Sequence, residues 1–114
     1  MTPQEIMDGM ANKNRQLTMK NAEYMELSEK MAQAKRDYAI AKANRTLELK
    51  AEGHSVTLIP TLVAGCRVVA DYCYKADVAE GVYRACFESI KDIRSAIDSY
   101  RSLLTWMREE LHRA

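Results

Sequence analysis

The sequence is poor in residues that interrupt secondary structure. Its 114 residues include four Gly and two Pro, the residues that most often mark turns. A fold with many short strands and tight turns is therefore not expected. No apolar run approaches the ~20 residues that a membrane-spanning helix needs, and the N-terminus lacks the basic-then-apolar layout of a secretion signal. These absences predict a soluble protein without a membrane segment.

Cysteine is also sparse. The three residues Cys66, Cys73 and Cys86 make an odd number without CxxC spacing, which favours reduced thiols in a cytoplasm. On one helix, Cys66 and Cys73 would lie about 10 Å apart along the axis. That separation exceeds the ~7 Å limit between the Cα atoms of a disulfide, so we expect no intrachain bridge.

Charge and composition describe an ordinary folded chain. Seventeen basic and sixteen acidic residues give a net charge of +1, and 47 % of the residues are hydrophobic. A chain that coats nucleic acid non-specifically is usually more basic. Good helix formers such as Ala, Glu, Lys, Leu, Arg and Met dominate the composition. The length allows a single domain over residues 1–114.

A first long helix is predicted over about residues 3–52. Thr2 and Glu5, with Pro3 between them, form a capping box at its start. Gly53 is placed to end the helix in a left-handed conformation. Between them, one apolar stripe recurs in steps of three and four residues. Its members are Leu17, Tyr24, Leu27, Met31, Ala34, Tyr38 and Ala41.

Residues 53–60 are predicted to form the turn of the chain. Val56, Leu58 and Ile59 are too apolar for a plain solvent loop, so we expect them to cover the end of the helices. Thr57 is suited to cap a helix, and Pro60 fits a first helical turn. A short helix is therefore predicted at about 58–64, ending near Gly65.

The second long helix, predicted at about 66–112, carries the strongest pattern. Apolar residues alternate in steps of three and four over six heptads, which indicates a left-handed seam against another helix. We call these positions the seam: Val69, Tyr72, Ala76, Ala79, Tyr83, Cys86, Ile90, Ile93, Ile97, Tyr100, Leu104, Met107 and Leu111. The matched helix lengths predict an all-α fold, a coiled-coil-like antiparallel hairpin of two long amphipathic helices.

Apolar residues beside the seam predict self-association. Leu103, Leu104, Trp106 and Met107 lie opposite a polar start of the first helix and would form an exposed apolar patch in a monomer. A two-helix hairpin also buries little core. We expect a dimer or larger homo-oligomer, such as a four-helix bundle, with these four residues at the interface.

No motif predicts catalysis or a cofactor. Glu109 and His112 have the Glu-x-x-His spacing of di-iron bundles, but they fall in the last turn, where a solvated end is the favoured interpretation. Cys66 and Cys73, with His54, lack the spacing of a structural zinc site. The sequence contains no nucleophile and base pair or glycine-rich phosphate loop. We predict no enzyme, no metal and no catalytic residue.

A basic stretch leaves two interpretations open. Residues 30–50 carry a local excess of four positive charges. These side chains could contact a phosphate backbone or another anionic partner. Alternatively, they form a solvated face that acids of the second helix neutralise, and this second interpretation is favoured. The candidate contacts are Lys30, Lys35, Arg36, Lys42 and Arg45.

Two segments resemble a known group of proteins. The turn from Glu52 to Pro60 and the stretch from Ala79 to Ala85 resemble small helical proteins of phages and prophages of Gram-positive bacteria. Such proteins are encoded near recombination and replication genes, and their function is generally unassigned. The likeness covers about half of the chain, and Cys66 departs from the capping residue expected after Gly65. It implies a phage origin and the cytoplasm of a bacterial host cell, and it transfers no site.

Three functions follow as hypotheses. The first is a non-enzymatic, oligomeric interaction module that binds a phage or host protein of replication, recombination or host defence. The second is a nucleic-acid-binding recombination accessory that uses the basic face of the first helix. The third is a sponge that captures an anionic nucleotide signal between subunits.

Overall fold

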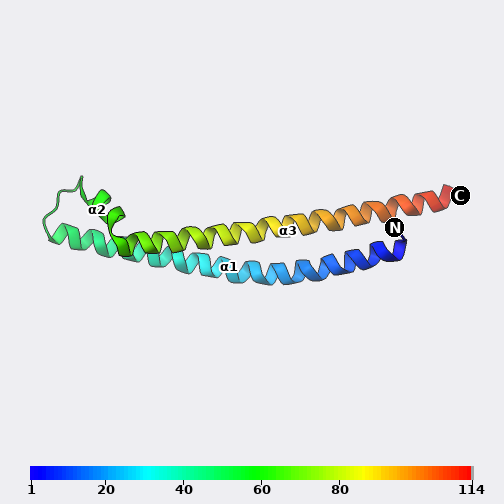
Figure 1. Ribbon diagram of the computed structural model, residues 1–114, viewed down its shortest axis with the longest axis horizontal. Helices are drawn as coiled ribbons and strands as arrows, with labels where there is room; N and C mark the ends of the chain where they lie inside the picture. The colour runs from blue at the N-terminus through cyan, green and yellow to red at the C-terminus, as the bar shows by residue number, and fades with distance from the viewer. Residues whose placement is uncertain (114) are drawn as a thin grey trace. The chain divides into compact units, whose positions relative to one another are not determined.

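The computed structural model describes residues 1–113 and contains three α-helices there, with no strand (Figure 1). Two are long, α1 (Pro3–Ala51) and α3 (Arg67–Arg113), and one is short, α2 (Ile59–Gly65). Helix accounts for 91 % of these described residues, far above the ~30–35 % of an average globular protein. The all-helical prediction is confirmed.

Local chemistry defines both ends of α1. At its start, the Glu5 amide donates to the Thr2 hydroxyl at 3.2 Å and the Thr2 amide donates to the Glu5 carboxylate at 3.2 Å, which confirms the capping box. At its end, the His54 amide donates to the Leu49 carbonyl at 3.2 Å, and Gly53 has a φ of +87°. These features define a Schellman cap, for which glycine is the favoured residue.

The chain divides into two compact units. Unit 1 combines Met1–Met25, which includes the first half of α1, with the α3 residues from Arg84 onward. Within it, the Cys86 thiol donates to the Lys20 carbonyl at 3.7 Å, and the rings of Tyr24 and Phe87 lie 6.0 Å apart. A Cβ at Gly9 would lie 2.7 Å from the Tyr100 ring, so the glycine allows this tyrosine to pack against the backbone of α1.

Unit 2 comprises Glu26–Tyr83, and its core lies where α1, α2 and α3 meet. There, α2 lies beside the C-terminal end of α1 (Figure 1). The core residues of the unit come from all three helices, so α2 completes a core that two helices alone would leave open. They are Leu49, Ile59, Val63 and Val69.

The short helix differs from its prediction in its cap. Leu58, not Thr57, occupies the N-cap position, and no side chain caps the helix. The Thr57 hydroxyl instead lies 3.2 Å from that of Ser55. Cys66 follows α2 in an extended conformation, and its carbonyl accepts the Ala70 amide at 2.9 Å. This one extended residue separates α2 from α3.

The predicted seam of α3 matches the pattern of burial. Its positions from Val69 to Met107 are buried or half-buried, whereas Leu111 is 73 % exposed. On α1, the predicted stripe is half-buried throughout. Among the described residues, the two most deeply buried large side chains are Ile6 and Leu49, and both lie outside that stripe. The predicted stripe therefore does not include the residues that α1 buries best.

Candidate interaction surfaces

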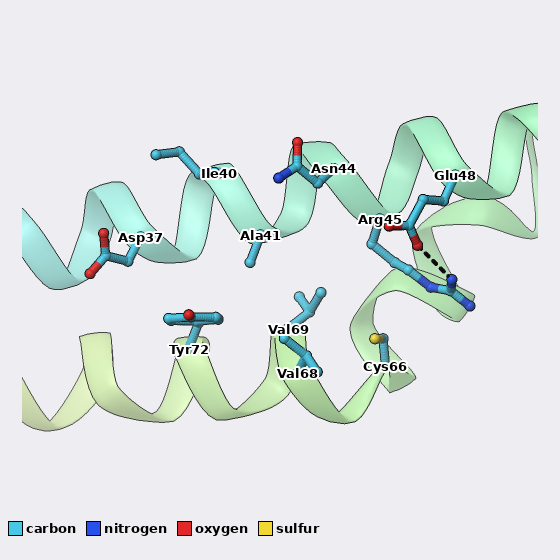
Figure 2. A pocket seen from close by; sticks show the side chains of 10 residues that line it. All are labelled: Asp37, Ile40, Ala41, Asn44, Arg45, Glu48, Cys66, Val68, Val69 and Tyr72. Atoms are coloured by element: carbon cyan, nitrogen blue, oxygen red, sulfur yellow. Dashed lines mark hydrogen bonds and ion pairs between the residues drawn. The ribbon is translucent and has the colours of Figure 1, made fainter.

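Unit 2 contains a surface pocket of about 500 Å³ between α1 and α3. Figure 2 shows Ala41 of α1 and Val69 and Tyr72 of α3 pointing toward one another across it. Ile40 and Val68 also line the pocket, and they are 52 % and 60 % exposed. The pocket therefore has an apolar floor and offers further apolar surface at its edge.

Arg45 contributes a positively charged group to the lining of this pocket. Its guanidinium Nη1 donates to the Glu48 carboxylate at 2.8 Å (Figure 2), and this hydrogen bond raises the pKa of Arg45. The Nε atom is buried and has no hydrogen-bond partner among the described residues.

The charge of the pocket restricts what it can bind. Arg45 contributes one positive charge, whereas Asp37 and Glu48 contribute two negative charges to the same lining. An anionic nucleotide would gain from Arg45 but would be repelled by both carboxylates. The pocket is better suited to an apolar side chain with a neutral carbonyl or amide oxygen nearby.

Interactions within the protein engage most of the basic residues singled out from the sequence. Lys35 lies 3.5 Å from Glu80 of α3, and Arg36 lies 3.7 Å from Asp37. The Lys42 ammonium lies 4.9 Å from the centre of the Tyr38 ring, a cation–π arrangement. Arg45 is paired with Glu48 as described above. The fifth residue, Lys30, is exposed on α1.

The four residues proposed for the oligomer interface fall into two groups. Leu104 and Met107, at seam positions of α3, are half-buried. Leu103 and Trp106, beside the seam, are 40 % and 59 % exposed. Only the second pair therefore offers much apolar surface to another molecule.

The candidate metal ligands are dispersed. Cys66 and Cys73 are half-buried free thiols, Cys86 is a buried one, and His54 pairs with Glu52 at 3.3 Å. Glu109 and His112 are exposed near the end of α3. Within residues 1–113, no three His, Cys, Asp or Glu side chains are grouped closely enough to hold a metal ion.

The pocket could not be predicted from the sequence, for a physical reason. Its lining comes from two segments, residues 37–48 and 66–72, and only the packing of α1 on α3 brings them together. Arg45 was predicted as a possible contact for an anionic partner because it belongs to a basic stretch, but its partner Glu48 lies three residues further along the same helix. An i,i+3 acid on the same face is the available sign that such an arginine is already paired.

Comparison of the chain with protein-family models, curated protein sequences and solved structures gave no match. None of the helices over the described residues is both long and apolar enough to cross a membrane.

Proposed function

We propose that the protein is a non-enzymatic interaction module of phage origin, which self-associates through its helices and binds another protein. The partner belongs to the replication or recombination machinery or to host defence. The proposal has three parts: an antiparallel helical hairpin, a contact between copies, and a protein partner. Different observations support each part.

Contacts within both units support the antiparallel hairpin. In unit 1, Gly9 approaches Tyr100, and the Lys20 carbonyl accepts from Cys86. In unit 2, Lys35 pairs with Glu80. Within unit 1, later residues of α1 thus meet earlier residues of α3. This order is expected when two helices run in opposite directions.

The exposed pair Leu103 and Trp106 is the observation that carries self-association. Both belong to one unit, and they are 40 % and 59 % exposed although both are large and apolar. Burying such a side chain is worth about 1.5–3 kcal/mol. Association of two copies through this surface would bury Leu103 and Trp106 of both copies.

The identity of the partner rests on the resemblance of the turn and of residues 79–85 to phage-encoded helical proteins. Their association with recombination and replication genes favours a protein of those systems. The exposed apolar positions, which include Val56 and Leu58 near the turn, favour a protein surface over a free small molecule.

A nucleic-acid partner has less support. Lys35, Arg36 and Arg45 each have an acid within 4 Å. Binding a phosphate backbone would therefore require competition with these acids. A nucleotide sponge is disfavoured at the unit 2 pocket, because its lining residues carry an excess of negative charge.

Replacing Trp106 with Glu tests self-association. The change places a charge in the exposed apolar pair and leaves the seam intact. Light scattering should give a wild-type mass of at least two 13.0 kDa chains and a monomer mass for Trp106→Glu, with the helix content unchanged. Leu47→Glu is the matched control, because Leu47 is 64 % exposed but belongs to α1, outside the exposed pair. A monomeric wild type would refute self-association.

A pull-down from phage-infected cells tests the partner. The full-length wild type and the Trp106→Glu variant serve as baits, and mass spectrometry identifies bound proteins, nucleic acids and nucleotides. The proposal expects a defined protein at stoichiometric amounts that withstands nuclease treatment. Recovery of nucleic acid alone, lost steeply with added salt, would replace it with the nucleic-acid function.

A further inference from the structure

A second stripe runs along α3 beside the seam. It begins at Asp71, ends at Arg113 and advances in alternating steps of four and three residues, so that its members share one side of the helix. Its first part, through Val82, belongs to unit 2, and its remainder belongs to unit 1. The stripe belongs to one uninterrupted helix, α3 (Arg67–Arg113).

Large apolar residues occur toward both ends of this stripe. Val78 and Val82 are 47 % and 46 % exposed, and Leu103 and Trp106 are 40 % and 59 % exposed. Counted from Asp92, Val78 and Trp106 both lie fourteen positions away. Val82 and Leu103 lie ten and eleven positions away. The apolar positions are therefore nearly symmetric about Asp92.

Small residues occupy the middle of the stripe with the same symmetry. Ala85 and Ser99 each lie seven positions from Asp92, and Ser89 and Ala96 lie three and four positions from it. Small side chains allow two helices to approach closely. Two copies aligned in opposite directions would therefore meet small against small in the middle and large against large on either side.

The charges toward the ends complete the symmetry. Lys75 lies seventeen positions before Asp92, and Glu110 lies eighteen after it. Asp71 and Arg113 each lie twenty-one positions away, so each acid would face a base across the symmetry axis. Among the described residues, no group forms an ion pair with Asp71. Opposite charges placed in this way favour one register over its neighbours.

We infer that α3 docks antiparallel on α3 of a second copy, with the two-fold axis at Asp92. Val78 of each copy then packs on Trp106 of the other, Val82 packs on Leu103, and Lys75 faces Glu110. This inference rests on the self-association proposed above and adds its direction and register. The Asp92 pair on the axis brings two like charges together, which restricts the dimer to moderate affinity.

Cross-linking between single cysteines tests the register. The background is the full chain with Cys66→Ser, Cys73→Ser and Cys86→Ala. Its helix content and the mass of its oligomer must match those of the wild type. Single cysteines are then introduced into this background one at a time, as Asp92→Cys, Val82→Cys and Leu103→Cys. A short bis-maleimide then joins cysteines that lie side by side in the oligomer.

The expected pattern is specific to the antiparallel register. Asp92→Cys cross-links to itself, because the axis brings both copies together there. Val82→Cys and Leu103→Cys do not cross-link when either variant is tested alone, because each cysteine lies about 30 Å, measured along the helix, from the same cysteine of the other copy. An equimolar mixture of these two variants cross-links, with the mixed species identified by mass.

The other outcomes overturn the inference in different ways. Self-cross-linking of both Val82→Cys and Leu103→Cys would mean a parallel dimer, and self-cross-linking of only one of them would move the two-fold axis away from Asp92. An oligomer in which none of the variants cross-links would place the interface on another face. These results would leave the proposed self-association intact. If the cysteine-free background is monomeric under conditions in which the wild type is oligomeric, the experiment is repeated with the native Cys86 restored. A monomeric wild type would contradict both proposals.

Discussion

Two half-buried lysines near the start of α1 show how single side chains adapt to the packing. Lys13 and Lys20 are half-buried, yet their ammonium groups reach Gln16 at 3.4 Å and Glu23 at 3.0 Å on the same helix. The Glu23 carboxylate raises the pKa of Lys20. Their aliphatic stems can cover apolar surface while the charged ends reach solvent. Because these positions are not apolar, the hydrophobic pattern of α1 is recognisable only from Leu17 onward.

The glycines of the long helices give the first prediction at this scale. A Cβ at Gly81 meets no atom within 4 Å, so Gly81→Ala should stabilise the protein by about 0.5–1 kcal/mol through helix propensity. A Cβ at Gly9 would lie 2.7 Å from the Tyr100 ring, so Gly9→Ala must displace a half-buried tyrosine. We expect it to be at least ~1 kcal/mol less stable than Gly81→Ala.

Urea unfolding of both variants at one protein concentration measures this difference. The two substitutions are chemically identical and both lie within long helices, so each is the control for the other. An equal gain from both would show that the Tyr100 ring moves aside freely and that Gly9 has no packing role.

At the scale of elements, periodicity predicts helices well and their caps less well. The α3 seam follows from the alternating steps alone, because burial on one side of a helix leaves that signature in the sequence. Thr57 is not the cap, because α2 begins at Ile59 with Leu58 at its N-cap position, and this start brings Ile59 and Val63 into the unit 2 core. Tertiary packing of Ile59 and Val63 outweighed the preference for a hydroxyl cap, which is worth about 1 kcal/mol.

Leu49 provides the prediction for this core. It is 2 % exposed and joins α1 to α2 and α3 in the cluster. Leu49→Ala should cost about 2–5 kcal/mol in the free energy of unfolding, because it leaves a cavity. Leu47, two residues earlier, is 64 % exposed, and Leu47→Ala should stay within about 0.5 kcal/mol of the wild type.

Chemical denaturation followed by circular dichroism separates the two variants. A small effect of Leu49→Ala would mean that α2 is not packed on α1 as described. Amide hydrogen exchange adds a local measurement, because loss of this core should lower protection in α2 before it does so in the distant part of α3.

At the scale of the whole molecule, sequence patterns predict the elements but not the surfaces that they create. The unit 2 pocket depends on two segments that are separated by α2 and the turn before it, and its charge depends on Arg45 being paired with Glu48. The second stripe of α3 was visible in part, since Leu103 and Trp106 stood out as surplus apolar residues. Its symmetry was missed because small and charged residues such as Ala96 and Lys75 carry no hydrophobic signal.

Reversal of charges at Lys75 and Glu110 is the sharpest prediction for the assembled protein. In the antiparallel dimer that we propose, these residues face each other twice, so Lys75→Glu or Glu110→Lys alone turns two attractions into repulsions. Each single variant should raise the dimer Kd about tenfold. The double variant restores opposite charges at both contacts and should return to within about threefold of the wild type, as measured by sedimentation equilibrium at low salt.

The restoration is the informative part, because interactions inside one chain cannot produce it. Lys75 lies 5.4 Å from the centre of the Tyr72 ring, and Glu110 pairs with Arg113 at 3.7 Å. Both are exposed contacts within one chain. If the substitutions acted only by removing these contacts, their effects on the dimer would add, and the double variant would form the weakest dimer. The two residues lie thirty-five positions apart on α3, about 50 Å along one helix, too far to interact within a single copy. A double variant weaker than either single variant would therefore exclude the antiparallel register, whereas recovery requires that Lys75 of one copy meet Glu110 of the other.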